Sequence, residues 1–162
     1  SALSRRYVYI VLESPVRPSL EAGRAGWVYR ALDEESMQKA SQHLLGEHDF
    51  SSFRASSCQA LSPIKTMTRV EIQKHGPYWR FEFEGNAFLH HMIRNIMGCI
   101  VTIGQGFQPP EWMAEVIACK SRDAAAPTFS PDGLYFQGPV YDPKWGLPAS
   151  TPPFYWLPST TP

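Results

Sequence analysis

The longest apolar segment of this chain, residues 85–106, constrains the fold most strongly. It reads GNAFLHHMIRNIMGCIVTIGQG and contains one formally charged side chain, Arg94. At about 100° of rotation per residue, its apolar side chains cover roughly half of a helix circumference, which is wide enough to pack against a core. The pattern therefore predicts one buried helix over residues 85–106, with Asn86 as its N-cap and Gly104 at its C-terminal end.

A polar stripe occupies the rest of this helix circumference. Its members are His90, His91, Arg94, Asn95, Gly98 and Thr102. Gly98 follows Arg94 by one turn, where the missing side chain lets another backbone segment or a ligand approach closely. A guanidinium on a mostly buried helix has to be paired, and its planar fork suits a carboxylate or a phosphate. Two interpretations stay open: a structural salt bridge, or an arginine that faces a ligand or a reaction.

The other periodic segments predict strands interleaved with helices. Strands are expected over residues 5–12, 67–74, 78–84 and 134–140, the middle two as a hairpin with one apolar face. Helices are expected over residues 34–45, capped by Asp33, and after the pair Pro109-Pro110. Residues 13–24 are predicted to form a loop. The fold class is therefore α/β in the α+β sense, a mixed, largely antiparallel sheet backed by helices.

Composition limits the class and the cellular setting of the chain. It has 162 residues, of which 43% are hydrophobic and 19% charged, and this indicates a soluble domain with a core. The polar residues within 85–106 argue against a membrane span. Three cysteines without paired spacing, and no recognisable secretion leader, favour the cytoplasm. We expect a domain over residues 1–148 and an extended, proline-rich tail over 149–162. The first residue, Ser1, favours a piece of a longer protein.

Charge and aromatic residues near the start of the chain bear on nucleic-acid binding. Net charge is zero, so any RNA contact needs a local basic patch. Such a patch is available in the first 30 residues, which contain Arg5, Arg6, Arg17, Arg24 and Arg30 against two glutamates. Tyr7 and Tyr9 lie on one side of the first strand. They are either core tyrosines whose hydroxyls find backbone partners, or rings that stack a base.

Motifs for metal or nucleotide chemistry are not found in the sequence. It contains no glycine-rich phosphate loop, G-x-S-x-G elbow, H-E-x-x-H or EF-hand spacing. His90 and His91 are adjacent, so on a helix they would point about 100° apart and would not share one metal. A polar role near Arg94 or an RNA contact suits them better. Leu134, judged by itself, is expected to be a core residue.

Four segments in matching order and spacing closely resemble the tRNA pseudouridine synthase A family. They are RRYVY from Arg5, LLGEHDFSSFR from Leu44, HGPYWRFEFEGNAFLHHMIRNIMG from His75 and PDGLYF from Pro131. The resemblance covers about residues 1–148. It implies a pseudouridine synthase fold and an enzyme that isomerises uridine to pseudouridine in the anticodon stem-loop of tRNA, at positions 38 to 40, without metal or cofactor. The family's catalytic aspartate lies in an R-T-D-A-G-V-H motif, which this chain lacks.

The resemblance also implies roles for individual residues. Arg94 resembles the arginine that pairs with the nucleophilic aspartate. Tyr7 resembles the tyrosine that packs on the flipped uracil and acts as the general base at C5, and Leu134 resembles the apolar residue that packs against the base or against the aspartate pair. Further candidates for RNA contacts or for support of the site are Arg5, Arg6, Arg54, His90, His91 and Asn95.

On this resemblance the chain is expected to be the C-terminal part of the enzyme and to be inactive alone, because the nucleophile lies outside it. Expected partners are tRNA and a second copy of the protein in a homodimer, with no membrane and no small-molecule cofactor. The alternative is a non-catalytic RNA-binding or dimerisation domain of the same fold.

Overall fold

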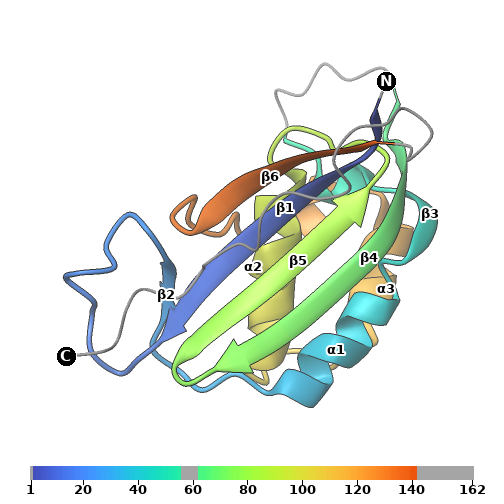
Figure 1. Ribbon diagram of the computed structural model, residues 1–162. Coiled ribbons are helices and arrows are strands. Elements are labelled where there is room, and N and C mark those ends of the chain that lie inside the picture. The colour runs from blue at the N-terminus through green and yellow to red at the C-terminus, as the bar shows by residue number, and fades with distance from the viewer. Residues whose placement is uncertain (1, 56–61, 142–162) are drawn as a thin grey trace.

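The computed structural model describes residues 2–55 and 62–141, and within them a twisted sheet carries its helices on one face (Figure 1). The sheet has six strands in the order β2-β1-β5-β4-β3, with β6 also paired to β1. The strands are β1 Ala2–Glu13, β2 Gly26–Val28, β3 Gly46–Asp49, β4 Ile64–His75, β5 Tyr78–Gly85 and β6 Leu134–Tyr141. The helices are α1 Glu34–Gln42, α2 Met92–Gly104 and α3 Trp112–Cys119, with short 3-10 turns η1 Ser51–Phe53 and η2 Arg122–Ala124. The predicted mixed, largely antiparallel sheet backed by helices is confirmed.

Strand β1 is the axis of the sheet. It pairs antiparallel with β5 along one edge, and on the other edge it pairs antiparallel with β6 and then parallel with β2. Along this edge of β1, Gly133 lies where pairing with β6 ends and pairing with β2 begins. Its φ is +91°, and its carbonyl accepts a hydrogen bond from the Ile10 N–H at 2.8 Å. A Cβ here would collide with the Ile10 carbonyl oxygen, so the tight junction requires glycine.

Alternation along β5 decides which face the helices cover. Trp79, Phe81 and Phe83 are at most 1% exposed and join the core under the helices. Their neighbours Arg80, Glu82 and Glu84 point to the opposite face. The predicted hairpin of β4 and β5 is therefore confirmed, although β4 begins three residues before the predicted start.

The predicted helix over residues 85–106 is wrong at its start. Gly85 ends β5, the chain then turns, and α2 begins only at Met92, after His91 in the left-handed conformation with φ of +63°. Asn86 is not the N-cap, because its side-chain carbonyl accepts a hydrogen bond from the Thr66 N–H at 2.8 Å. The helix ends at Gly104, as predicted.

Other predicted boundaries differ by a few residues. The predicted helix over residues 34–45 ends earlier, at Gln42, and β3 begins at Gly46. The predicted loop over residues 13–24 is followed by β2, which the sequence pattern did not indicate. The predicted domain boundary at residue 148 and the tail over 149–162 lie outside the described residues. Within residues 2–55 and 62–141, no helix is long and apolar enough to cross a membrane.

Candidate active site

A cavity of about 400 Å³ opens between the start of α2 with the segment before it, the middle of β1 and the first residue of β6. Five residues predicted from the sequence line it: Tyr7, His90, His91, Arg94 and Leu134. The other lining residues are apolar, namely Phe88, Leu89, Met92 and Ile93. The structure thus gathers residues from three separate segments around one hollow, and none of the described residues that line it carries a carboxylate.

Arg94 is held in place by backbone groups and not by an acid. Its Nε donates to the Phe129 carbonyl at 2.9 Å, and its own carbonyl accepts from the Phe129 N–H at 3.1 Å. Across residues 2–55 and 62–141 the side chain forms no ion pair. The backbone bond holds the Phe129 segment against α2, and the Nε bond fixes the guanidinium at the cavity wall, so an anion that enters the cavity meets a cation already in position.

Tyr9 anchors the segment that holds Arg94. Its side chain is fully buried, and its hydroxyl donates to the Ser130 carbonyl. Burial raises the pKa of Tyr9 above its ordinary value, and the adjacent Arg94 guanidinium offsets part of that rise. The phenol therefore stays protonated and serves as a hydrogen-bond donor. Of the two interpretations for this tyrosine, the core role with a backbone partner is confirmed.

Tyr7 lies on the same face as Tyr9 but reaches the cavity. Its half-buried ring meets the edge of Phe88 at 5.1 Å and the tilted ring of Phe136 at 5.2 Å, both measured between ring centroids. Its hydroxyl forms no hydrogen bond with the residues that the structure describes. Neighbouring rings therefore fix the plane of Tyr7 and leave the phenol oxygen available to a ligand.

Leu134 is the first residue of β6 and faces the same hollow. It pairs in register with Tyr9 and packs against the core under the helices. The preceding turn, Pro131-Asp132-Gly133, sets its position, because Gly133 takes a backbone conformation that favours glycine. Tyr7 and Leu134 together give the cavity an aromatic side and an aliphatic side, which suit a flat ring.

The histidine pair differs from the sequence-based expectation. His90 and His91 precede α2 instead of lying on it, and their rings stack with centroids 3.8 Å apart instead of diverging by about 100°. Both side chains are exposed at the mouth of the cavity. Burial lowers the pKa of His91, and His90 and Arg94 lower it further. A neutral imidazole therefore stands beside the guanidinium at neutral pH.

Asn95 is a buried clamp and not a residue that can reach RNA. Asn95 is 1% exposed, and its Nδ2 donates to the Phe53 carbonyl at 2.8 Å. Its Oδ1 accepts hydrogen bonds from the Thr128 hydroxyl at 2.7 Å and from the Arg122 guanidinium at 3.1 Å. The amide therefore ties α2 to η1 and to the segment that precedes Phe129. Of the two roles left open for Asn95, an RNA contact and support of the site, its burial and these hydrogen bonds favour support of the site.

Sequence reasoning missed Arg122, the partner of this clamp. Its guanidinium also donates to the Ala126 carbonyl at 2.9 Å and so holds together the segment that leads to Phe129. One signal for this packing was present at Gly98, where a close approach was expected. The Pro127 carbonyl indeed lies where a Cβ of residue 98 would stand.

The three remaining predicted arginines do not line the cavity. Arg6 points to the opposite face of the sheet, where it pairs with Glu82 at 3.2 Å and Glu84 at 3.5 Å. Because these two glutamates hold the Arg6 guanidinium on that face, a direct contact with a ligand in the cavity is disfavoured. Arg5 is exposed, and Arg54 follows η1 beside Ala55, whose N–H donates to the His90 carbonyl at 3.3 Å.

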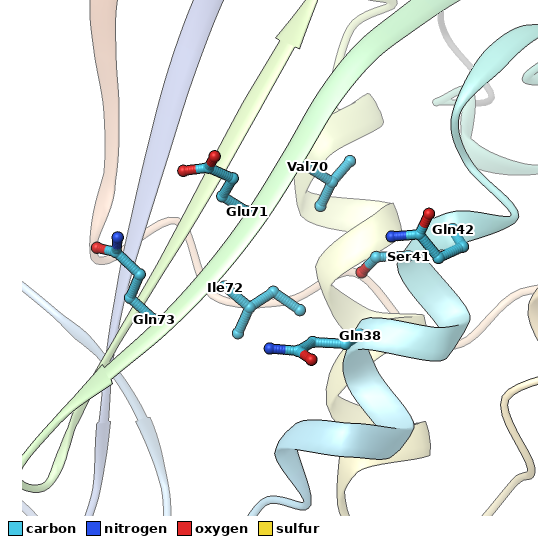
Figure 2. Close-up of a pocket in the computed structure, with 7 residues that line it drawn as sticks. All are labelled: Gln38, Ser41, Gln42, Val70, Glu71, Ile72 and Gln73. Atoms are coloured by element: carbon cyan, nitrogen blue, oxygen red, sulfur yellow. The ribbon is translucent and has the colours of Figure 1, made fainter.

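A second hollow, of about 320 Å³, lies between α1 and the outer edge of β4 (Figure 2). Val70 and Ile72 point toward α1, and Gln38 reaches toward Ile72. Glu71, on the other side of the strand, pairs with Arg69 at 2.7 Å. Neutral amides and aliphatic groups dominate here, so this hollow offers neither an uncompensated cation nor a nucleophile.

No group of three or more histidine, cysteine, aspartate or glutamate side chains that could hold a metal occurs within residues 2–55 and 62–141. The first cavity offers a flat ring contacts with Tyr7 and Leu134, and Arg94 can orient an anion there, such as a carboxylate.

The chain is similar in sequence to known tRNA pseudouridine synthases. A family model described as tRNA pseudouridine synthase matches residues 40–142. The chain is 70% identical to the tRNA pseudouridine synthase A of Polaromonas naphthalenivorans strain CJ2, over 98% of the chain and 61% of that protein. It is 66% identical to the protein of the same name from Acidovorax sp. strain JS42, over 97% of the chain and 62% of that protein.

A more distant relative, from Methylibium petroleiphilum strain PM1, has the same name and is 60% identical over 98% of the chain and 61% of its own length. The chain thus spans a little over three fifths of the length of these relatives. Since the family model covers more than half of the chain and the identities are high, the chain belongs to the tRNA pseudouridine synthase family.

Proposed function

We propose that this chain supplies one wall of the active site of a tRNA pseudouridine synthase, whose nucleophilic aspartate comes from a part of the protein beyond the chain. The observation that carries the proposal is Arg94, a guanidinium fixed at the wall of a cavity without an acidic partner among the described residues. A carboxylate that enters from another segment would complete the ion pair.

The reaction requires such a cavity. The N1–C1′ bond of uridine must break, the uracil must turn while it stays bound, and a C5–C1′ bond must form. The base gains a proton at N1 and loses the one at C5. The site must therefore hold a flat ring, exclude water and keep a carboxylate charged next to it. Arg94 would keep the aspartate ionised and orient it, because a bidentate cation favours the charged form of a carboxyl group.

Tyr7 and Leu134 would hold the detached base. The Tyr7 ring, set by Phe88 and Phe136, offers a face for the uracil, and Leu134, on the neighbouring strand, offers a second apolar contact. The Tyr7 hydroxyl, which has no hydrogen-bond partner among the described residues, is our candidate for the base that removes the C5 proton. His90 and His91, exposed at the mouth, and Arg5 on the same face of β1 as Tyr7, are candidates for contacts with the RNA backbone.

The finer features of the proposal follow from the family resemblance. The substrate is the anticodon stem-loop of tRNA with uridine at positions 38 to 40, the protein acts as a homodimer in the cytoplasm, and neither metal nor cofactor takes part.

Release of tritium from tRNA labelled at uridine C5 tests the proposal, because the C5 proton leaves once per turnover. The full-length protein that contains this chain should release tritium, and the chain alone should not. Sequencing of the product for pseudouridine should place it at positions 38 to 40. Release by the chain alone would overturn the shared active site, whereas tRNA binding by the full-length protein without any release would favour a non-catalytic RNA-binding domain.

A further inference from the structure

A continuous row of arginine and aromatic side chains lies at the end of α2 that is remote from Arg94. The Arg17 guanidinium stands 4.9 Å from the centre of the Trp27 ring, and the Trp27 and Tyr29 rings are 6.3 Å apart. The Arg30 guanidinium lies 5.6 Å from the Tyr29 ring and 5.1 Å from the Phe107 ring. We call these five residues the arginine–aromatic row.

Local backbone structure explains why the row forms. Within β2 the side chain of Val28 turns into the core and is 4% exposed, so Trp27 and Tyr29 both face outward. The Trp27 indole donates to the Ser14 carbonyl at 2.9 Å, which fixes its ring beneath Arg17. Phe107 follows Gly106, whose φ of +85° turns the chain back toward Arg30 after α2 ends.

The row is accessible and carries uncompensated positive charge. Tyr29 is 57% exposed and Phe107 is 59% exposed. Neither Arg17 nor Arg30 forms an ion pair with any residue in the described part of the chain. The nearest acids in the sequence are engaged elsewhere: Glu13 accepts from the Leu32 N–H at 2.8 Å, Glu21 accepts from the Tyr78 hydroxyl at 2.7 Å, and Asp33 caps α1 through the Ser36 N–H at 3.2 Å. None of these five side chains lines the cavity at Arg94.

This combination of groups suits RNA. A guanidinium that lies flat over a ring keeps its N–H edge directed outward, where it can donate two hydrogen bonds to a phosphate. Exposed rings between such cations offer stacking faces to unpaired bases. An acidic peptide would use the charges but would have no need for the exposed aromatic faces.

We propose that the arginine–aromatic row is a second tRNA-binding surface, which contacts phosphates and unstacked bases away from the nucleotide that is modified. Arg94 lies ten residues before Gly104, the last residue of α2, so a helical rise of 1.5 Å per residue puts the end of the helix that leads to Phe107 about 15 Å from Arg94. The row would then hold a part of the tRNA that Arg94 does not reach. This inference rests on the proposed function, because the ligand is the substrate tRNA.

Variants of the full-length protein test the row. The double variant Arg17→Ala/Arg30→Ala and the single variant Phe107→Ala are compared with Lys39→Ala, an exposed cation on α1 that lies outside the row and pairs with Glu35. The dissociation constant for unmodified tRNA is measured at several salt concentrations, together with KM and kcat for tritium release and the thermal unfolding midpoint.

The double variant should weaken tRNA binding at least tenfold and reduce the slope of log K against log salt by about 1 to 2, because up to two phosphate contacts are lost. Phe107→Ala should weaken binding by about tenfold with an unchanged slope, since it removes stacking and no charge. Both should raise KM more than they lower kcat, whereas Lys39→Ala should behave like the wild type.

Affinities and slopes equal to those of Lys39→Ala would overturn the inference. A lowered unfolding midpoint with unchanged affinity would also overturn it, because the row would then pack against another part of the protein. Polyglutamate that competes as well as tRNA at equal charge would point to an acidic protein partner instead. If the wild type binds tRNA but releases no tritium, the proposed function fails. The measured affinities and salt slopes of the variants then still test whether the arginine–aromatic row binds tRNA.

Discussion

Gly98 is the point at which α2 touches the segment that fixes Arg94, so an alanine there perturbs both stability and function. A Cβ at residue 98 would collide with the Pro127 carbonyl oxygen, a backbone atom that cannot turn away like a side-chain end. Overpacking of this kind costs about 3 kcal/mol at the upper end, and the higher helix propensity of alanine offsets about 1 kcal/mol. Gly98→Ala should therefore lower the free energy of unfolding by about 2 kcal/mol.

The same helix offers a matched control. A Cβ at Gly104 would meet the Met37 Sδ at 2.7 Å and Cγ at 2.9 Å, and both atoms belong to a flexible side chain. Met37 can adjust its rotamers, so the gain in helix propensity should offset most of the clash. Gly104→Ala should remain within about 1 kcal/mol of the wild type.

Urea denaturation and thermal unfolding of the full-length protein measure both variants. A loss of about 2 kcal/mol corresponds to a fall in the midpoint of about 4–8 °C for a domain of this size. Displacement of Pro127 also moves Phe129, whose carbonyl holds the Arg94 Nε, so kcat of Gly98→Ala should fall at least about tenfold. If Gly98→Ala were as stable as the wild type or gained about 1 kcal/mol, the argued contact would be refuted.

Two further predictions concern the groups around the cavity. Tyr9→Phe removes the hydrogen bond to the Ser130 carbonyl and should lower the free energy of unfolding by about 1 kcal/mol. Tyr7→Phe should leave the free energy of unfolding within about 0.5 kcal/mol of the wild type and instead lower turnover. Equal losses of stability in urea denaturation would contradict the distinction. The pKa of His91, measured by NMR titration, should lie below 6.5, and His90→Ala should raise it part of the way toward 6.5. A His91 pKa of 6.5 in the wild type would refute the assigned environment.

The lowered pKa of His91 predicts that its contribution to stability decreases as the pH falls. Below pH 6.5 the unfolded state takes up a proton on this histidine before the folded state does. The contribution of His91 is therefore fully present above pH 6.5 and is lost as the pH falls through the lower pKa of the folded state. The exposure of the imidazole keeps this contribution small.

The sequence predicted the elements whose pattern is set by one buried face. Trp79, Phe81 and Phe83 alternate so regularly that β5 and its orientation followed directly. Arg94 stood out because a lone cation in an apolar helix needs a partner, whatever the details of the fold. These predictions depend on local periodicity and on the physical chemistry of single residues.

Features that arise from tertiary packing could not be predicted in the same way. The apolar residues Phe88 and Leu89 continue the helical period, although one packs on Tyr7 and the other enters the core before α2 begins. Strand β2 has three residues and β3 has four, and both exist through pairing with β1 and β4 and not through a pattern of their own. The clamp at Asn95 depends on Arg122, 27 positions later, and no local pattern links them.

The turnover of Arg94→Ala in the full-length protein tests the central claim most directly. With Lys39→Ala as the control for loss of an exposed cation, kcat for tritium release from C5-labelled tRNA should fall on the order of 100-fold or more, because a preorganised cation at the reacting groups is removed. The unfolding midpoint should fall only slightly, since Arg94 forms no ion pair with the described residues and the variant loses one hydrogen bond, to the Phe129 carbonyl. Turnover near the wild-type value would contradict the claim that Arg94 orients the carboxylate of the active site.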